Sequence, residues 1–172
     1  MGKMRVTVGV PAYNEEVTIG RLLKDILSQP LDDKASLEEV IVNVSGSTDG
    51  TGAAVLEVSG SDPRVHLIGK EGRGGKTAAL NDILQYATGE IMVFIDGDTV
   101  LGEGSLNNLV KPLLMSGDVG VASGHVVPLK EEEGFFLFAS HFIRQLHHEL
   151  CCRLVEMGLA TKVDGSFYAF RR

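Results

Sequence analysis

Short apolar runs alternate along this chain with longer segments in which apolar residues recur every three or four positions. The short runs predict β-strands, and the longer segments predict amphipathic helices. Strands are expected at residues 5–10, 39–44, 65–68, 90–95, 119–122, 125–129 and 166–170. Such alternation is typical of an α/β domain with a mainly parallel sheet. No internal repeat, low-complexity tract or linker interrupts the pattern, so we expect one domain over residues 1–172.

The helix after the first strand is expected to begin at a cap formed by Asn14, with Glu15 and Glu16 in its first turn, where negative charge is favourable. Further helices are expected at residues 51–58, after the glycines of 72–75, from Ser105, and over 134–157. The last of these carries an apolar stripe made of Phe135, Phe138, Phe142, Leu146, Leu150 and Leu154. The strand at 90–95 is apolar throughout, which predicts burial on both faces.

Composition and charge narrow the class of protein. The formal net charge is −7, which argues against a nucleic-acid-binding surface but permits the binding of a single nucleotide. No stretch approaches the ~20 apolar residues of a membrane-spanning helix. The only cysteines, Cys151 and Cys152, are adjacent and unsuited to an ordinary disulfide with each other. We therefore expect a reducing, cytoplasmic location, at the cytoplasmic membrane face if the chain belongs to a larger protein.

Unusual residues follow four successive predicted strands. These segments are residues 11–15 (PAYNE), 45–50 (SGSTDG), 72–76 (GRGGK) and 96–98 (DGD). In open α/β sheets, ligands bind outside the carboxyl ends of the strands. The four segments are therefore expected to converge on one site.

Two carboxylates in this set point to a metal. Asp96 and Asp98 flank Gly97 in a tight turn directly after the apolar strand. Mn²⁺ and Mg²⁺ prefer such oxygen ligands and share their remaining positions with phosphate oxygens and water. A metal in this position would neutralise charge on a departing diphosphate.

The glycines at 72–75 precede Lys76 at the start of a predicted helix, a pattern that suits a phosphate group. The same pattern raises the alternative of a P-loop nucleotide hydrolase. However, the P-loop spacing requires glycine at the position of Lys70. Tyr13 could stack on a nucleobase, and the pair Thr48 and Asp49 could serve as a helix cap or as a ligand contact.

A second cluster lies far along the chain. His147 and His148 precede Cys151 and Cys152 by four residues, so each His–Cys pair shares a helix face. A zinc site needs two more ligands of suitable type. The sequence offers none nearby, and we interpret these residues as ordinary polar or half-buried helix positions.

Taken together, these segments resemble the family 2 glycosyltransferases of the GT-A fold. The segments that carry the resemblance are VTVGVPAYNEE, SGSTDGT, GGKTAALN, ATGEIMVFIDGDT and GSFYAFRR, in the family's order from about Val6 to the last residue. The resemblance implies a donor-binding part over about residues 1–100 and the start of an acceptor-side part over about 101–172. It also implies metal-dependent, inverting transfer of a sugar from a nucleoside diphosphate to an acceptor hydroxyl of a saccharide or lipid.

The resemblance also implies roles for individual residues. Pro11, Ala12, Tyr13 and Glu15 would line the nucleoside pocket, and Lys76 would lie near the base or the phosphates. Asp96 would face the ribose and the metal, Asp98 would be the principal ligand of Mn²⁺ or Mg²⁺, and Gly97 between them would complete the donor site. A non-catalytic nucleotide-sugar-binding module is a further alternative.

Two departures from the family pattern change these expectations. Val44 and Ser45 replace the two aspartates that the family commonly has there, one of which recognises the base. A hydroxyl at Ser45 can still form a hydrogen bond, so we expect weaker base discrimination, with Tyr13 supplying much of the contact. The family's general base lies in an acidic motif beyond the last strand. We therefore expect a chain truncated before its base, inactive or slow alone, with Asp164 as the only candidate base.

Overall fold

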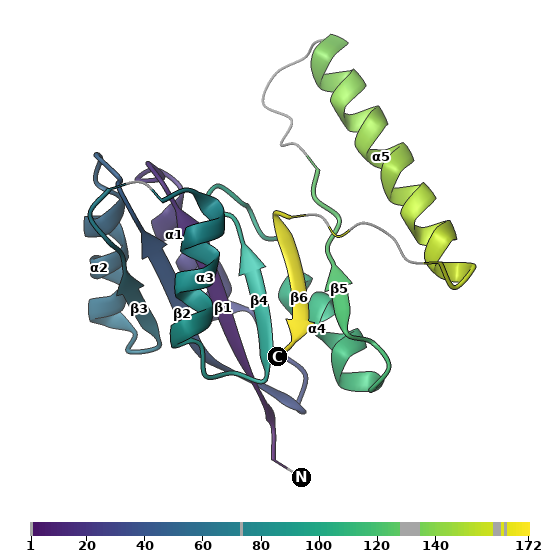
Figure 1. Cartoon of the computed structure of the whole chain (residues 1–172), viewed down its shortest axis with the longest axis horizontal. Coiled ribbons are helices and arrows are strands. Elements are labelled where there is room, and N and C mark those ends of the chain that lie inside the picture. Colours follow the sequence, from purple (N-terminus) through teal and green to yellow (C-terminus); the bar gives the residue numbers. More distant parts are fainter. Residues whose placement is uncertain (1, 73, 128–134, 160–162, 164) are drawn as a thin grey trace.

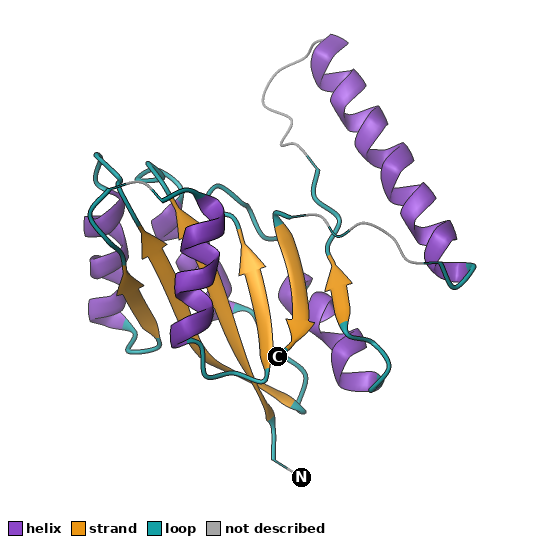
Figure 2. Ribbon diagram, in the orientation of Figure 1, coloured by secondary structure: helices purple, strands orange, loops and turns teal. Residues whose placement is uncertain are grey.

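The computed structural model describes residues 2–72, 74–127, 135–159, 163 and 165–172. Its strands form a six-stranded sheet in the order β3-β2-β1-β4-β6-β5 (Figures 1 and 2). The strands are β1 (Met4–Ala12), β2 (Ala35–Val44), β3 (Val65–Ile68), β4 (Ile91–Ile95), β5 (Val121–Ser123) and β6 (Phe167–Arg171). The helices are α1 (Ile19–Ser28), α2 (Thr51–Ser61), α3 (Lys76–Tyr86), α4 (Ser105–Met115) and α5 (Phe135–Glu156).

The sheet is mainly parallel, as the sequence predicts. β1 pairs in parallel with β2 and β4, and β2 pairs in parallel with β3. β6 runs antiparallel between β4 and β5. The four parallel strands therefore end along one edge, at the top of the sheet in Figure 1.

Two apolar layers cover the faces of the sheet. On one face, β1 contributes Val6, Val8 and Val10, which belong to a core cluster that also contains side chains of α1, α2 and α4. On the other face, a smaller cluster joins Ile41, Met92 and Phe94 to Ile83 and Ala87, at the end of α3. Alternate strand residues face opposite sides, so β2 and β4 contribute apolar side chains to both layers. β4 is buried at every position, as its unbroken apolar run predicts.

The predicted boundaries are corrected at several points. The first helix begins at Ile19 rather than beside Asn14. The strand expected at 119–122 is found at Val121–Ser123, and residues 125–127 of the strand expected at 125–129 form no regular element. Positions 128 and 129 lie outside the described residues.

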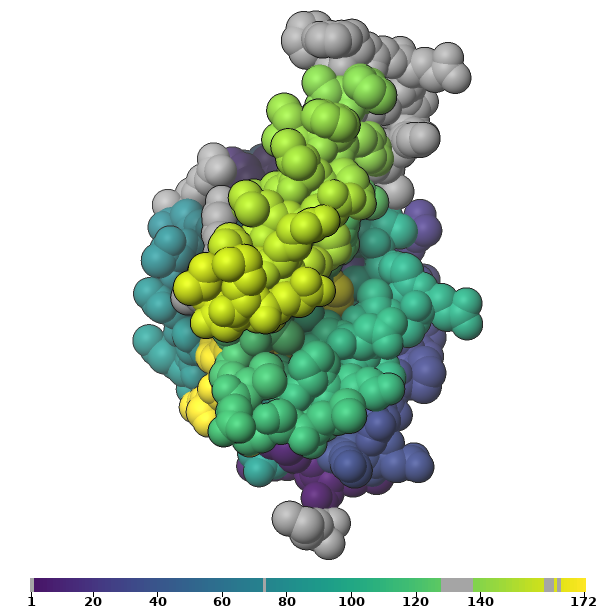
Figure 3. All heavy atoms as spheres, turned by 90° about the vertical axis from the view of Figure 1, so that its right-hand side faces the viewer, coloured from purple at the N-terminus to yellow at the C-terminus, as the bar shows by residue number. Residues whose placement is uncertain are grey.

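Helix α5 stands apart from the sheet, beside the segment that follows β5 (Figures 1 and 3). The His125 and His148 rings lie 3.9 Å apart between centroids, and Arg144 Nη1 donates to the Val126 carbonyl at 3.4 Å. The expected apolar stripe is largely exposed, including Phe138, Phe142, Leu146 and Leu150. The side chain of Phe135, also part of that stripe, lies outside the described part of the chain. We find no helix among the described residues that is long and apolar enough to cross a membrane.

Candidate functional site

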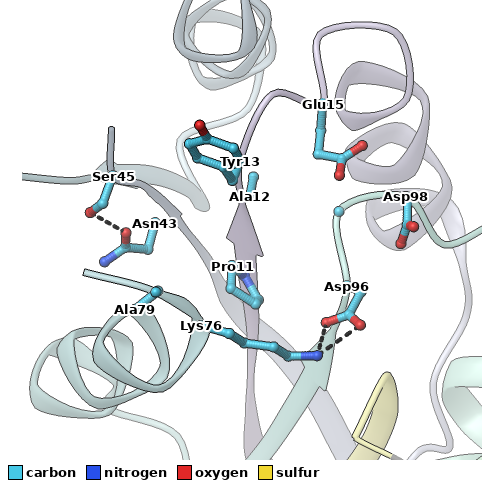
Figure 4. A pocket seen from close by; sticks show the side chains of 12 residues that line it. Pro11, Ala12, Tyr13, Glu15, Asn43, Ser45, Lys76, Ala79, Asp96 and Asp98 are labelled. Carbon is cyan, nitrogen blue, oxygen red and sulfur yellow. Dashed lines mark hydrogen bonds and ion pairs between the residues drawn. The ribbon is translucent and has the colours of Figure 1, made fainter. Parts of the chain in front are cut away.

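A cavity of about 220 Å³ lies at the carboxyl edge of the parallel strands. All nine residues that the sequence analysis assigned to the donor site line it, and Figure 4 labels all of them except Gly97. They are Pro11, Ala12, Tyr13, Glu15, Ser45, Lys76, Asp96, Gly97 and Asp98. The walls also contain Asn43, Gly75 and Ala79, of which Asn43 and Ala79 were missed. The chain therefore brings the four separate segments together, as expected from the positions of the strand ends.

Asn43, which the sequence analysis did not assign to the site, could have been recognised by its position in the sequence. It is the one amide in the otherwise apolar stretch VIVNV near the end of β2. A polar side chain on a central strand must find a partner or face a ligand. That signal could have marked Asn43 as a site residue, whereas Ala79 carries no comparable signal.

The loop after β1 bends at Asn14 instead of starting a helix there. Asn14 has φ 57°, the left-handed conformation that asparagine tolerates better than most residues. Its Oδ1 accepts a hydrogen bond from the backbone N–H of Thr48 at 2.9 Å, and its own N–H donates to Ser47 Oγ at 3.2 Å. Asn14 thus joins the loops after β1 and β2 and places Tyr13 at the cavity.

Three further hydrogen bonds hold the same two loops together. The backbone N–H of Glu15 donates to Thr51 Oγ1 at 2.8 Å, and that of Glu16 donates to Asp49 Oδ2 at 3.2 Å. In return, Glu16 Oε2 accepts the Gly50 N–H at 2.7 Å. Asp49 also accepts the Thr51 N–H at the start of α2, so its contacts support the loops and the helix end. Neither Thr48 nor Asp49 lines the cavity.

Gly97 allows the end of β4 to approach the loop after β1. A β-carbon at this position would lie 3.1 Å from Glu15 Cγ and 3.4 Å from Ala12 Cβ. Thr18 Oγ1 reinforces the approach, because it lies 3.0 Å from the Gly97 carbonyl and 3.1 Å from Glu15 Oε2. The glycine between the two aspartates therefore sets how closely they approach Glu15.

Lys76 connects three segments at the floor of the cavity. Its Nζ lies 2.5 Å from Asp96 Oδ1 and 2.8 Å from Oδ2, and it donates to the Gly165 carbonyl at 2.9 Å. The first residue of α3 is thereby tied to the end of β4 and to the residues preceding β6. Asp98 is exposed, and its side chain makes no hydrogen bond or ion pair with the described part of the chain.

Negative charge accumulates on one side of the cavity. Partial burial raises the pKa of Glu15 above 4.5, and the charges of Asp98, Asp49 and Asp96 raise it further, while the hydrogen bond from Thr18 opposes them. A site in which one carboxylate perturbs the pKa of another favours an added cation. Asp96 and Asp98 supply the oxygen ligands that Mn²⁺ and Mg²⁺ prefer.

The donor set is nevertheless incomplete as a cage made of protein alone. No group of three or more His, Cys, Asp or Glu side chains suited to a metal is found among the residues that the structure describes. Mg²⁺ usually binds through one or two carboxylates together with phosphate oxygens and water. The residues present therefore fit a cation that is held jointly with a phosphorylated ligand.

The remaining candidates lie outside this cavity. Asp164, the candidate base, lies outside the described residues, as does Arg73 in the glycine-rich segment. The histidine–cysteine pairs are adjacent on α5, with His147 Nε2 to Cys151 Sγ and His148 Nε2 to Cys152 Sγ both at 3.7 Å. His125 lies beside His148, yet these residues form no group of three or more side chains suited to a metal within the described chain.

The fold and the cavity define an α/β domain of the nucleotide-binding class, with its ligand site at the carboxyl ends of parallel strands. The sequence profile of glycosyl transferase family 2 matches residues 7–158. The chain belongs to this family, and its fold is that of the GT-A glycosyltransferases. Family membership also removes the P-loop hydrolase as an interpretation.

Individual relatives agree with this assignment. Glycosyltransferase GlyA of Streptococcus pneumoniae is 31% identical over 145 residues, which cover 84% of this chain and 20% of the relative. A mannosyltransferase of Pyrobaculum calidifontis, solved in complex with GDP-Man and Mn²⁺, is 35% identical with a TM-score of 0.71. That match covers 99% of this chain and 45% of the other.

A third protein shows a similar fold at lower identity. Glucosyl-3-phosphoglycerate synthase of Mycobacterium tuberculosis, solved with Mn²⁺, UDP and its product, has a TM-score of 0.67 at 26% identity. The match covers 98% of this chain and 57% of that protein. The chain thus spans between about a fifth and three fifths of the length of these three proteins.

Proposed function

We propose that the cavity binds a nucleoside-diphosphate sugar together with Mn²⁺ or Mg²⁺. We further propose that the protein containing this chain transfers the sugar to an acceptor hydroxyl. The observation that carries the proposal is the convergence of Tyr13, Lys76, Asp96 and Asp98 from separate segments on one cavity. The GDP-Man, UDP and Mn²⁺ complexes of the similar structures support the same ligand class. In this proposal residues 1–172 form a single glycosyltransferase domain.

The two ends of the cavity suit the two parts of such a donor. Asp98 and Asp96 would hold the cation, and a bound Mn²⁺ or Mg²⁺ supplies positive charge that stabilises a departing diphosphate. Lys76 lies beside Asp96 and can donate to a phosphate oxygen, while Tyr13 and Pro11 offer surfaces to the nucleoside. Attack by the acceptor hydroxyl opposite the departing diphosphate would invert the anomeric carbon.

The acceptor in this proposal is a saccharide or a lipid-linked saccharide. A Campylobacter jejuni relative, 29% identical over 108 residues, is named a glucosyltransferase of an undecaprenol-linked oligosaccharide. Such an acceptor would bring the full protein to a membrane surface. In this proposal the described residues provide the cavity that would hold the donor.

Calorimetry with Asp98→Ala tests the donor site. UDP and GDP are titrated into the wild-type chain with MnCl₂ and with a chelator. We expect Mn²⁺ to raise the affinity of the better nucleotide by at least about tenfold, equivalent to 1.4 kcal/mol. Asp98→Ala should remove most of that gain, because it removes an oxygen ligand of the cation.

The matched control is Asp118→Ala, which removes the same charge from an exposed turn after α4. It should retain the full effect of Mn²⁺. Equal nucleotide affinity with Mn²⁺ and with chelator in the wild-type chain would contradict the proposed metal site. Absence of any nucleotide affinity would contradict the donor site as a whole.

A further inference from the structure

Asn43 occupies the end of the cavity opposite the two aspartates. It lies on β2, paired with Pro11 of β1 and Ile68 of β3, and is only 1% exposed. Figure 4 shows Asn43 and Ser45 on one side of Pro11, with Asp96 and Asp98 on the other. The cavity therefore separates an amide-lined end from a carboxylate-lined end.

A short chain of hydrogen bonds fixes how the Asn43 amide is turned. The backbone N–H of Lys70 donates to Ser45 Oγ at 3.3 Å, so this oxygen serves as an acceptor. The Ser45 hydroxyl then donates to Asn43 Oδ1 at 2.6 Å. The opposite orientation would bring a second donor to Ser45 Oγ and leave the hydroxyl hydrogen without Oδ1. The network thus assigns Oδ1 to Ser45 and leaves Nδ2 as the free group.

The Asn43 Nδ2 group is a buried donor with no hydrogen-bond partner among the described residues. Buried donors are nearly always paired, because an unpaired one loses its hydration without compensation. An unpaired donor in the wall of a ligand cavity therefore indicates that the ligand supplies the acceptor.

The geometry points to Asn43 as a residue that selects the nucleobase of the donor. This inference rests on the proposed function and concerns the base end of the same site. Nδ2 donates a hydrogen bond to a carbonyl oxygen or an unprotonated ring nitrogen on the edge of the base. Lys76, Asp96 and Asp98 hold the diphosphate end, so the two ends of the donor are recognised independently.

This assignment changes how the replacement of two carboxylates by Val44 and Ser45 is expected to affect nucleobase selection. At these positions the chain has no carboxylate to accept an N–H from the base. It offers instead an amide donor one residue earlier, held in place by Ser45. The protein therefore donates the hydrogen bond to the base, whereas a carboxylate would accept one. With this donor, Asn43 can discriminate among bases, although the sequence led us to expect weak base discrimination.

The test compares two substitutions that differ in polarity. Asn43→Leu keeps the number of side-chain heavy atoms but removes both the Nδ2 donor and the Oδ1 acceptor. Asn43→Asp keeps the acceptor for Ser45 and replaces the donor with a second acceptor. UDP, GDP, CDP and pyrophosphate are titrated by calorimetry with Mn²⁺ into each variant and into the wild type. Asn81→Asp, on the exposed side of α3, adds the same charge away from the base end and serves as the control.

We expect Asn43→Leu to weaken the preferred nucleotide by about tenfold and to bring the three nucleotides closer together in affinity. Asn43→Asp should weaken the preferred nucleotide further, since a carboxylate repels an acceptor on the base. Pyrophosphate affinity should stay within twofold in both variants, because the diphosphate end is untouched.

Three results would overturn the inference. One is that the differences in affinity among the three nucleotides stay the same in both Asn43 variants. Another is an equal loss of affinity for all ligands, pyrophosphate included, which indicates a structural role. The third is tighter binding of the preferred nucleotide by Asn43→Asp, which shows that the base presents an N–H there. If the wild type binds no nucleotide, the proposed function fails, whereas nucleotide binding with any of these three results refutes only the role of Asn43.

Discussion

Gly9, in the middle of β1, is a position at which a single added carbon should disturb the packed layer between the sheet and α3. A β-carbon there would lie 2.6 Å from Met92 Cε, 2.7 Å from Ile83 Cγ2 and 2.8 Å from Phe94 Cε1. The Met92 methyl can move, but the β-branched Ile83 and the Phe94 ring have little freedom in this buried layer. Extra carbons in a packed core cost about 1–3 kcal/mol, and with two stiff neighbours we expect Gly9→Ala to cost about 2 kcal/mol.

Urea unfolding, followed by circular dichroism, measures this cost. With a slope of about 2 kcal/mol per molar urea, the midpoint should fall by about 1 M. The matched control is Gly20→Ala in α1, where an added β-carbon meets nothing within 4 Å. That substitution should stabilise the protein by about 0.4–1 kcal/mol, because alanine has less freedom than glycine in the unfolded chain.

The two substitutions are expected to change the free energy of unfolding in opposite directions, and this contrast tests the reasoning. If Gly9→Ala unfolds at the same urea concentration as the wild type, the layer between β1 and α3 is looser than the distances indicate. If Gly20→Ala is destabilised as much as Gly9→Ala, the effect reflects loss of glycine in general and not contact with Met92, Ile83 and Phe94.

Two further predictions concern charged groups. Burial raises the pKa of Glu39, but hydrogen bonds from Thr88 and Thr7 outweigh it and hold the pKa below 4.5. The unfolded chain therefore binds more protons, so the free energy of unfolding should fall as the pH drops below about 4.5. Urea titrations between pH 6 and pH 3 should show less loss in Glu39→Gln, and equal loss in both proteins would refute the assignment. Lys76→Met should weaken a nucleoside diphosphate by at least about tenfold, through loss of a charge-assisted hydrogen bond, yet leave the corresponding nucleoside unchanged in NMR titrations. An equal loss for both ligands would place Lys76 at the base.

Much of the site follows from the sequence because its determinants are local. Each strand is an apolar run that ends at a polar segment, and parallel strands bring such ends to one edge. This reasoning placed Asp96, Asp98 and Lys76 in a single cavity, which the structure contains. Their roles as ligands of a metal and a donor stay predictions.

The errors arise where long-range contacts override local preference. Asn14 has the sequence signature of a helix cap, yet its side chain and N–H bond to Thr48 and Ser47 across the gap between two loops. Those partners lie more than thirty residues away, so no local pattern could identify them. Likewise, the apolar stripe of α5 predicted the helix correctly, but helical periodicity carries no information about long-range contacts, and the stripe is largely exposed in the structure.

Helix α3 provides the physical link between the stability of the domain and recognition at the cavity. Its first turns contribute Lys76 and Ala79 to the cavity wall, while Ile83 packs on the sheet beside Gly9. Because a helix moves largely as a rigid unit, displacement of Ile83 also displaces Lys76, about two turns away. Lys76 would then leave the position from which it contacts both Asp96 and Gly165. The close contact at Gly9 therefore helps to hold the Lys76 ammonium group beside Asp96, and Gly9→Ala should weaken diphosphate binding even in the molecules that remain folded.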